Sequence, residues 1–222
     1  MKNKKKYYGV SFILFCIAVL YTVLVKFVDV DSIGPNGSSV GFSTINHLVQ
    51  EGIGTSDFWY QVTKYLGIIP FLLVSFYGIQ WLMELIHFRK ISKVNRKLLF
   101  LGGLYILLGI TYIFFEKVII NYRPVLMDGE LEASYPSSHT LLALTICLSS
   151  LLISKDYFKH ELICKIIDGG TILLMILLVL GRILSGVHWI SDIMGGVIIS
   201  LFLVSLYYAF IKSIRITSHT KK

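Results

Sequence analysis

Apolar residues gather in six runs that are separated by polar segments. Each run is close to the roughly 20 residues that an α-helix needs to cross the hydrocarbon core of a bilayer. The fourth run is short for this length, so its helix is expected to begin within residues 134–138. The runs comprise residues 8–28, 66–86, 98–115, 139–154, 166–184 and 193–211. The pattern predicts an all-α, polytopic membrane protein, a six-transmembrane helix bundle in which residues 1–222 form a single membrane domain.

Composition agrees with this pattern. Of the 222 residues, 55% are hydrophobic and only 15% are charged. Soluble domains carry about 25% charged residues, so this chain is short of the polar surface that a water-soluble protein needs. The six spans leave no room for a second, soluble domain.

Positive charge is concentrated in the segments on one side of the predicted bundle. Of the 21 lysines and arginines, the N-terminus holds four, the 87–97 loop five, the 155–165 loop three and the C-terminus four. Such segments stay in the cytoplasm, which predicts that both termini are cytoplasmic. This distribution explains the net charge of +8 without a nucleic-acid partner. The other basic residues fall at or near the outer face, and they are Lys26, Lys64, Lys117, Arg123 and Arg182. We interpret Lys26 and Lys64 as interface anchors.

The first outer loop, residues 29–64, divides into two parts. Residues 29–39 are rich in Gly, Pro, Asn and Asp, which is typical of turns. From Ser43 to about Glu51, apolar residues recur at helical spacing, which predicts a short helix lying in the outer interface. This helix is either a packing lid over the bundle or a device that admits an amphiphilic substrate.

Polar and charged residues cluster in three segments that meet the outer face. They are residues 116–124 (EKVIINYRP), 135–140 (YPSSHT) and 181–192 (GRILSGVHWISD). Charged residues near hydrocarbon are costly, and a bundle has no structural use for several of them at one end. Because all three segments are predicted on one side, a single site can collect them.

The residue types in these segments suit an anion. Arg123 and Arg182 carry planar guanidinium forks that match tetrahedral oxyanions. Ser137 and Ser138 supply hydroxyl groups, and the helix that follows Pro136 presents free N–H groups and a positive dipole end. The structural alternatives are that the arginines snorkel to lipid headgroups and that a serine caps the fourth transmembrane helix.

Two histidines complete this group. His188 and Asp192 are four residues apart, so on a helical turn they share one face, where the carboxylate can fix the imidazole tautomer. Asp192 can alternatively cap the sixth transmembrane helix. His139 has no carboxylate at the same spacing. Two histidines in different settings beside two arginines indicate one nucleophile or base and one acid, acting on a phosphate.

These segments resemble the three-part signature of the type 2 phosphatidic acid phosphatase superfamily, which includes lipid phosphate phosphatases and relatives of the vanadium haloperoxidases. Arg123-Pro124 matches the end of the first part, and Pro136-Ser137-Ser138-His139 matches the second with Ser in place of Gly. Gly181-Arg182, five residues, His188, three residues and Asp192 match the third with Gly in place of Ser. The signature region spans about residues 116–192.

One position departs from this signature. Glu116 stands where the family has a lysine, and Lys117 follows one place later. One residue on a regular helix is a rotation of about 100°. Either a local irregularity brings Lys117 to the phosphate, or the phosphate is bound without it.

The resemblance implies hydrolysis of a phosphomonoester or diphosphate lipid through a phosphohistidine, with no metal and no cofactor. It implies that His188 attacks phosphorus, Asp192 orients His188, and His139 protonates the leaving oxygen. The implied phosphate ligands are Arg123, Arg182, Ser137, the backbone N–H of Ser138 and, if it reaches the site, Lys117.

An outward-facing site at the membrane surface favours a lipid phosphate as substrate. Candidates are phosphatidic acid, phosphatidylglycerophosphate and a polyprenyl diphosphate, in a multi-pass protein of the cell membrane with an extracytoplasmic active site. Two alternatives remain open, a lipid phosphotransferase and a non-catalytic lipid or anion transporter. Gly195 and Gly196 permit close helix contact, either within the bundle or between chains.

Overall fold

The chain folds into α-helices, and a few isolated β-bridges lie in the connections between them. The structure, a computed structural model, describes residues 2–158 and 160–219. Its helices are α1 Lys2–Phe27, α2 Ser43–Ile53, α3 Asp57–Leu66, α4 Ile69–Phe88, α5 Arg96–Lys117, α6 Ser138–Tyr157, α7 Glu161–Ser185 and α8 Ile190–His219, with 3-10 turns η1 Pro35–Gly37 and η2 Ile91–Lys93. Lys159, Lys221 and Lys222, which belong to the basic segments, lie outside the described residues.

Within the described residues, six helical segments are long and apolar enough to cross a membrane. They are residues 5–27, 57–88, 96–117, 138–157, 161–185 and 190–214. Each contains most of one predicted span, and the fourth begins at Ser138, inside the expected 134–138 window. The prediction of an all-α, six-span fold is therefore confirmed. The second segment consists of α3 and α4, which are separated by a short break at Gly67 and Ile68.

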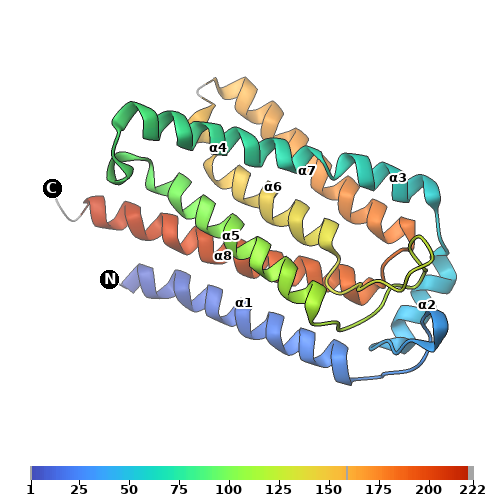
Figure 1. The fold of residues 1–222 in the computed structure, drawn as a ribbon. Helices are drawn as coiled ribbons and strands as arrows, with labels where there is room; N and C mark the ends of the chain where they lie inside the picture. The colour runs from blue at the N-terminus through green and yellow to red at the C-terminus, as the bar shows by residue number, and fades with distance from the viewer. Residues whose placement is uncertain (1, 159, 220–222) are drawn as a thin grey trace.

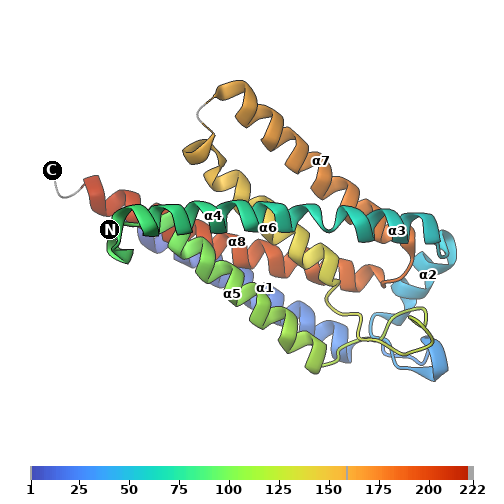
Figure 2. The same cartoon turned by 45° about the horizontal axis from the view of Figure 1, so that its top comes forward.

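The spans run up and down, so their ends form two opposite faces. Both termini lie at one end of the bundle, and α2, α3 and the long connection between α5 and α6 lie at the other (Figure 1). Helix α8 packs against α1, α5 and α6, and α7 packs against α3 and α6. Figure 2 shows α7 leaning away from the bundle at its N-terminal end while its C-terminal end stays beside α3. The first residues of α6 and α8 and the last residues of α5 and α7 consequently meet at the end opposite the termini.

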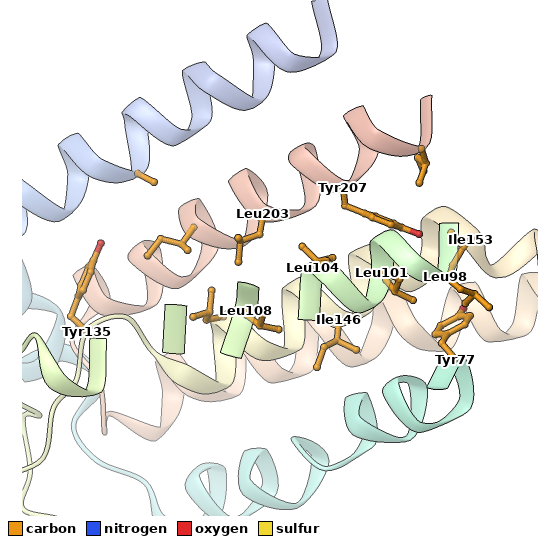
Figure 3. Close-up of a cluster of buried hydrophobic side chains, with 14 of the residues drawn as sticks. Tyr77, Leu98, Leu101, Leu104, Leu108, Tyr135, Ile146, Ile153, Leu203 and Tyr207 are labelled. Carbon is orange, nitrogen blue, oxygen red and sulfur yellow. The ribbon is translucent and has the colours of Figure 1, made fainter. Parts of the chain in front are cut away.

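The hydrophobic core packs together α5, α6 and α8, whose ends meet opposite the termini. Leu101 and Leu104 of α5, Ile146 of α6 and Leu203 of α8 lie together in the interior and are at most 5% exposed (Figure 3). Lipid tails are as apolar as these side chains, so the helices associate through close packing more than through a hydrophobic drive. The packing holds α5, α6 and α8 in fixed register.

The first outer loop contains more helix than the sequence predicts. The expected helix from Ser43 to Glu51 is present as α2, and its start is capped by Asp29, whose carboxylate accepts the Thr44 N–H at 2.9 Å and the Ser43 hydroxyl at 2.9 Å. These hydrogen bonds, that of the Thr44 N–H first, lower the pKa of Asp29. The position of α2 in the membrane interface stays a prediction. The interpretation of residues 57–64 as loop is wrong, because α3 begins at Asp57, with Ser56 as its N-cap.

Two buried asparagines tie the first outer loop to the start of α8. The Asn46 side chain donates to the Ser191 hydroxyl at 2.8 Å and accepts the Ser191 N–H at 3.1 Å. Asn121 accepts the Gly41 N–H at 3.0 Å and donates to Asp192 at 3.1 Å. A loop fixed in this way belongs to the framework of this end of the bundle.

The two adjacent glycines of α8 make their close contacts inside the bundle. A Cβ on Gly195 would lie 2.3 Å from the ring of Tyr135, and one on Gly196 would lie 3.1 Å from Cβ of Thr140. The Tyr135 hydroxyl also hydrogen-bonds Thr22 of α1 at 2.8 Å. Because these two glycines have no side chains, the segment before α6 can lie directly on α8.

Candidate active site

The three signature segments converge at the end of the bundle opposite the termini. Arg123 comes from the connection after α5, His139 from the first turn of α6, and Arg182 from the last turn of α7. His188 lies in the short turn between α7 and α8. These four side chains contact one another in one cluster, as the sequence predicts.

Arg182 is a buried cation. Its side chain is 1% exposed, which excludes the snorkelling alternative. One terminal nitrogen, Nη1, donates to the Thr63 hydroxyl at 3.3 Å, and the guanidinium carbon lies 5.6 Å from the centre of the Tyr60 ring. Its Nε has no hydrogen-bond partner, and no ion pair to it is found in the described part of the chain. A buried charge without a counter-charge is costly, so this guanidinium marks an anion site.

The surroundings of His188 determine which of its nitrogens is protonated. Its Nε2 lies 3.3 Å from Nη1 of Arg123 and 3.5 Å from Nη2 of Arg182. Guanidinium nitrogens only donate, so Nε2 holds a lone pair and Nδ1 holds the hydrogen. Burial first, and then the charges of Arg123 and Arg182, hold the pKa of His188 well below its ordinary value. The ring is therefore neutral at neutral pH, with its nucleophilic nitrogen facing the arginines.

His139 is arranged in the opposite way. Its Nδ1 accepts from Nη2 of Arg182 at 3.0 Å, so the hydrogen of the neutral ring is on Nε2. The ring packs against the break between α3 and α4, where a Cβ on Gly67 would lie 2.9 Å from Cδ2 of His139. One arginine nitrogen, Nη2 of Arg182, thus contacts both histidines.

Asp192 reaches His188 through a third residue. His188 precedes α8, so the two side chains do not share a helical face and the geometric basis of that prediction is wrong. Instead, Oγ of Ser134 lies 3.0 Å from Nδ1 of His188 and 2.5 Å from Oδ2 of Asp192. Asp192 is fully buried and also accepts the backbone N–H of Trp189, just before α8, at 3.2 Å.

The start of α6 offers further donors to an anion. The first backbone N–H of α6 that bonds back along the helix is that of Leu141, which donates to the Ser137 carbonyl at 2.9 Å. The N–H groups of the preceding residues, including Ser138, have no acceptor within the helix. The Ser137 hydroxyl accepts from Thr140 at 3.1 Å, which leaves its own hydrogen to donate, and the Ser137 side chain makes no capping bond.

The structure does not bring Lys117 into this site. Helix α5 continues without a break to Lys117, whose side chain is exposed. Glu116, in the family's lysine position, lines the same small cavity as Arg123 and His188, whereas Lys117 does not. Arg123 is held on its outer side by Glu132, whose Oε2 lies 3.1 Å from Nε.

Sequence reasoning misses the supporting residues Thr63, Tyr60 and Ser134. Thr63 and Tyr60 lie on α3, most of which falls in the predicted outer loop. The amphipathic pattern of α3 is short and is followed directly by the apolar run of the second span. Ser134 lies two residues before the second signature part, and no spacing rule connects it to His188. The Gly67 interruption in the second span is the signal that could have indicated a separate α3.

The site geometry agrees with the comparison to protein families. A sequence model of the PAP2 superfamily matches residues 97–215, which is more than half of the chain. The chain belongs to the PAP2 superfamily. The resemblance inferred from the three signature parts is thereby confirmed, and the phosphatases of this superfamily are phosphoric ester hydrolases.

Individual relatives resemble this PAP2 protein over part of its length. Sphingosine-1-phosphate phosphatase 2 of Mus musculus is 30% identical over 91 residues, which is 40% of this chain and 25% of the relative. The Homo sapiens protein of the same name is 28% identical over 86 residues, 38% of this chain and 21% of the relative. The chain thus matches about a quarter or less of these curated relatives.

A solved structure shares the whole fold. The transmembrane PAP2-type phosphatidylglycerolphosphate phosphatase of Bacillus subtilis aligns with a TM-score of 0.58 and 17% identity, covering 92% of this chain and 96% of that one. At this identity the match supports the fold and leaves the substrate open.

Proposed function

We propose that this PAP2 protein is a membrane lipid-phosphate phosphatase that hydrolyses a phosphomonoester or diphosphate lipid through a phosphohistidine on His188. The observation that carries the proposal is the buried guanidinium of Arg182, which lacks a counter-charge and contacts both histidines. A phosphoryl group bound there supplies the missing negative charge. Fixed donors aimed at a reacting phosphoryl group are the main source of catalysis in phosphoryl transfer.

Binding of the phosphoryl group changes the state of both histidines. In the unliganded site, the arginine N–H groups cover Nε2 of His188 and Nδ1 of His139. Once phosphoryl oxygens accept those N–H groups, Nε2 of His188 is free to attack. Nδ1 of His139 is then free to take up a proton, which gives the imidazolium form that an acid catalyst needs.

The proposed reaction has two steps. In the first, the lone pair on Nε2 of His188 forms a bond to phosphorus, the bond from phosphorus to the lipid oxygen breaks, and His139 gives its proton to that oxygen. In the second, His139 takes a proton from water, the water oxygen bonds to phosphorus, and the phosphorus–nitrogen bond breaks to release phosphate. Arg123, Arg182, Ser137 and the Ser138 N–H hold the phosphoryl oxygens throughout, and Lys117 has no part in this scheme.

The site's place at the end of the bundle supports a lipid substrate. The cluster lies at the ends of the apolar helices, with His139 in the first turn of one candidate span and Arg182 in the last turn of another, so a headgroup can bind among the arginines while its chain stays in lipid. The distribution of basic residues supports the outer, extracytoplasmic face of the cell membrane for this end. The candidates are phosphatidic acid, phosphatidylglycerophosphate, a polyprenyl diphosphate and, from the relatives' names, a sphingoid-base phosphate.

Phosphate release from these four lipids by the purified protein tests the proposal. We expect release from at least one lipid, its loss in His188→Ala, and full activity in EDTA because the arginines and the α6 N-terminus supply the charge stabilisation. Lipid binding without turnover would favour a transporter, and diversion of product from free phosphate to an added alcohol would favour a phosphotransferase. Unchanged release by His188→Ala would contradict the phosphohistidine, and loss of activity in EDTA would contradict the metal-free scheme.

A further inference from the structure

Ser134 occupies a fixed position between the proposed nucleophile and its carboxylate. The residue lies in the connection between α5 and α6 and is 2% exposed. Its backbone N–H donates to the Asn121 carbonyl at 2.9 Å, and the ring of the next residue, Tyr135, packs on Gly195. Both its hydroxyl and its carbonyl oxygen face Nδ1 of His188, at 3.0 and 3.1 Å.

The hydrogen-bonding roles in this contact follow from its partners. Nδ1 of His188 carries a hydrogen, because the arginines contacting Nε2 can only donate. An ionised carboxylate can only accept, so the Ser134 hydroxyl gives its hydrogen to Oδ2 of Asp192 at 2.5 Å. The Nδ1–H of His188 then has two acceptors on Ser134, the hydroxyl oxygen at 3.0 Å and the carbonyl oxygen at 3.1 Å. Through the hydroxyl, hydrogen bonds connect His188 with Asp192.

The other partners of Asp192 hold its carboxylate in this orientation. Oδ1 accepts from the side chain of Asn121 at 3.1 Å and from the Ser191 hydroxyl at 3.4 Å. Oδ2 accepts the Trp189 N–H at 3.2 Å in addition to Ser134. No direct bond from Asp192 to His188 is found among the hydrogen bonds of residues 2–158 and 160–219. The hydrogen-bonded path from the carboxylate to the imidazole therefore runs through the serine hydroxyl.

We propose that Ser134 is a positioning residue that couples Asp192 to His188, fixing the Nδ1–H tautomer and stabilising the positive charge that the ring gains when Nε2 bonds to phosphorus. This inference rests on the proposed function. It differs from the expectation of a direct Asp192–His188 contact by placing a neutral hydroxyl between the two groups. Outer partners that orient a reactive imidazole are worth about 10-fold to 100-fold in activity at metal-bound histidines, and we expect the same scale here.

Variants at Ser134 and Asp192 test this coupling. We would measure kcat, KM and thermal unfolding for Ser134→Ala, Ser134→Thr, Asp192→Asn and the Ser134→Ala/Asp192→Asn double variant, with phosphate release as the assay. Ser200→Ala is the matched control, since Ser200 is equally buried but bonds only to carbonyls of Leu141 and Gly196. We expect Ser134→Ala to lower kcat about 10-fold to 100-fold with KM within about twofold, and Ser134→Thr to keep most of the activity.

The double variant separates coupling from a merely structural role. If Ser134 carries the effect of Asp192, the double variant is no slower than the more severe single variant. Two results would overturn the role of Ser134 and leave the proposed function standing, provided that the wild type is active. One is a double variant whose loss of kcat equals the product of the two single losses. The other is a Ser134→Ala protein as active as Ser200→Ala. A wild type that releases no phosphate from any lipid would overturn both proposals. If Ser134→Thr unfolds at a lower temperature than the wild type, its activity no longer tests the coupling, and the comparison of the double variant with the single variants decides whether Ser134 couples Asp192 to His188.

Discussion

At the scale of single residues, the site is defined by where hydrogens and charges lie. His188 presents a lone pair and His139 a hydrogen at Nε2, and both assignments follow from contact with groups that only donate. Arg182 joins the two rings through one nitrogen. The two neutral histidines thus carry their hydrogen on opposite ring nitrogens because of their neighbours.

The acid role of His139 predicts a dependence on the leaving group. We expect His139→Asn to slow release from a lipid phosphate by about 100-fold or more, the usual contribution of a positioned proton donor being about 10²–10⁴. Release from p-nitrophenyl phosphate should fall far less, because its leaving oxygen needs no proton. The measurement is kcat/KM for both substrates in each protein. Equal losses on the two substrates would show that His139 does not act as the acid.

The lowered pKa of His188 predicts the pH dependence. Neutral His188 is the reactive form, and burial with Arg123 and Arg182 keeps the ring neutral below its ordinary pKa of 6.5. Protonation should therefore reduce kcat/KM only at pH values well below 6.5, after correction for the ionisation of the substrate itself. The measurement is kcat/KM from pH 5 to 8, which reports groups of the free enzyme. A decline centred at 6.5 would mean that the arginines do not act on the ring.

At the scale of elements, the apolar runs predict the six spans because helix length in a membrane is set by bilayer thickness. The same rule misses α3, because residues 57–66 mix polar and apolar side chains and lie almost entirely before the apolar run predicted at 66–86. The shared helical face predicted for His188 and Asp192 is wrong because four-residue spacing places side chains together only within a helix, and α8 begins at Ile190. Convergence of the signature segments was predictable from topology alone, whereas the place of Ser134 depends on how the chain turns between α5 and α6.

The contact between α8 and the segment before α6 predicts a strong effect of a single methyl group. In Gly195→Ala the new Cβ would clash with the Tyr135 side chain, lying 2.7 Å from its Cζ and 2.8 Å from its hydroxyl oxygen, so this side chain must move together with Ser134 beside it. We expect a loss of about 1–3 kcal/mol in stability, as for other overpacked cores, and a clear fall in kcat. Gly102→Ala on α5 is the control, because nothing lies within 4 Å of its Cβ. Thermal unfolding and phosphate release would be measured together, and a Gly195→Ala protein matching the control would contradict this contact.

At the scale of the whole molecule, all the reactive groups lie at one end of the bundle and both termini at the other (Figure 1). The basic segments accompany the termini, so orientation in the membrane decides which compartment the substrate headgroup must reach. The fold alone does not set this orientation. It follows from charge outside the site.

Thiol labelling of intact cells checks the orientation. In a Cys16→Ala background, we expect a membrane-impermeant maleimide to label Glu130→Cys, in the exposed connection before α6, without permeabilisation. Lys90→Cys, in the exposed basic loop at the other end, should react only after the membrane is opened. Cys147 and Cys164 are buried and serve as an unreactive background. The reverse labelling pattern would place the active site in the cytoplasm.

The contacts between α3 and the site residues also affect how this protein can change over evolution. The family match begins at residue 97, yet Thr63 and Tyr60 hold Arg182, and Gly67 backs His139, from a part of the chain before that point. The reactive residues and the residues that support them therefore lie in separate stretches of the sequence. Substitutions within residues 57–67 can therefore shift Arg182 and His139 while the signature stays unchanged, and a chimera exchanging only that stretch between two relatives would isolate such a change.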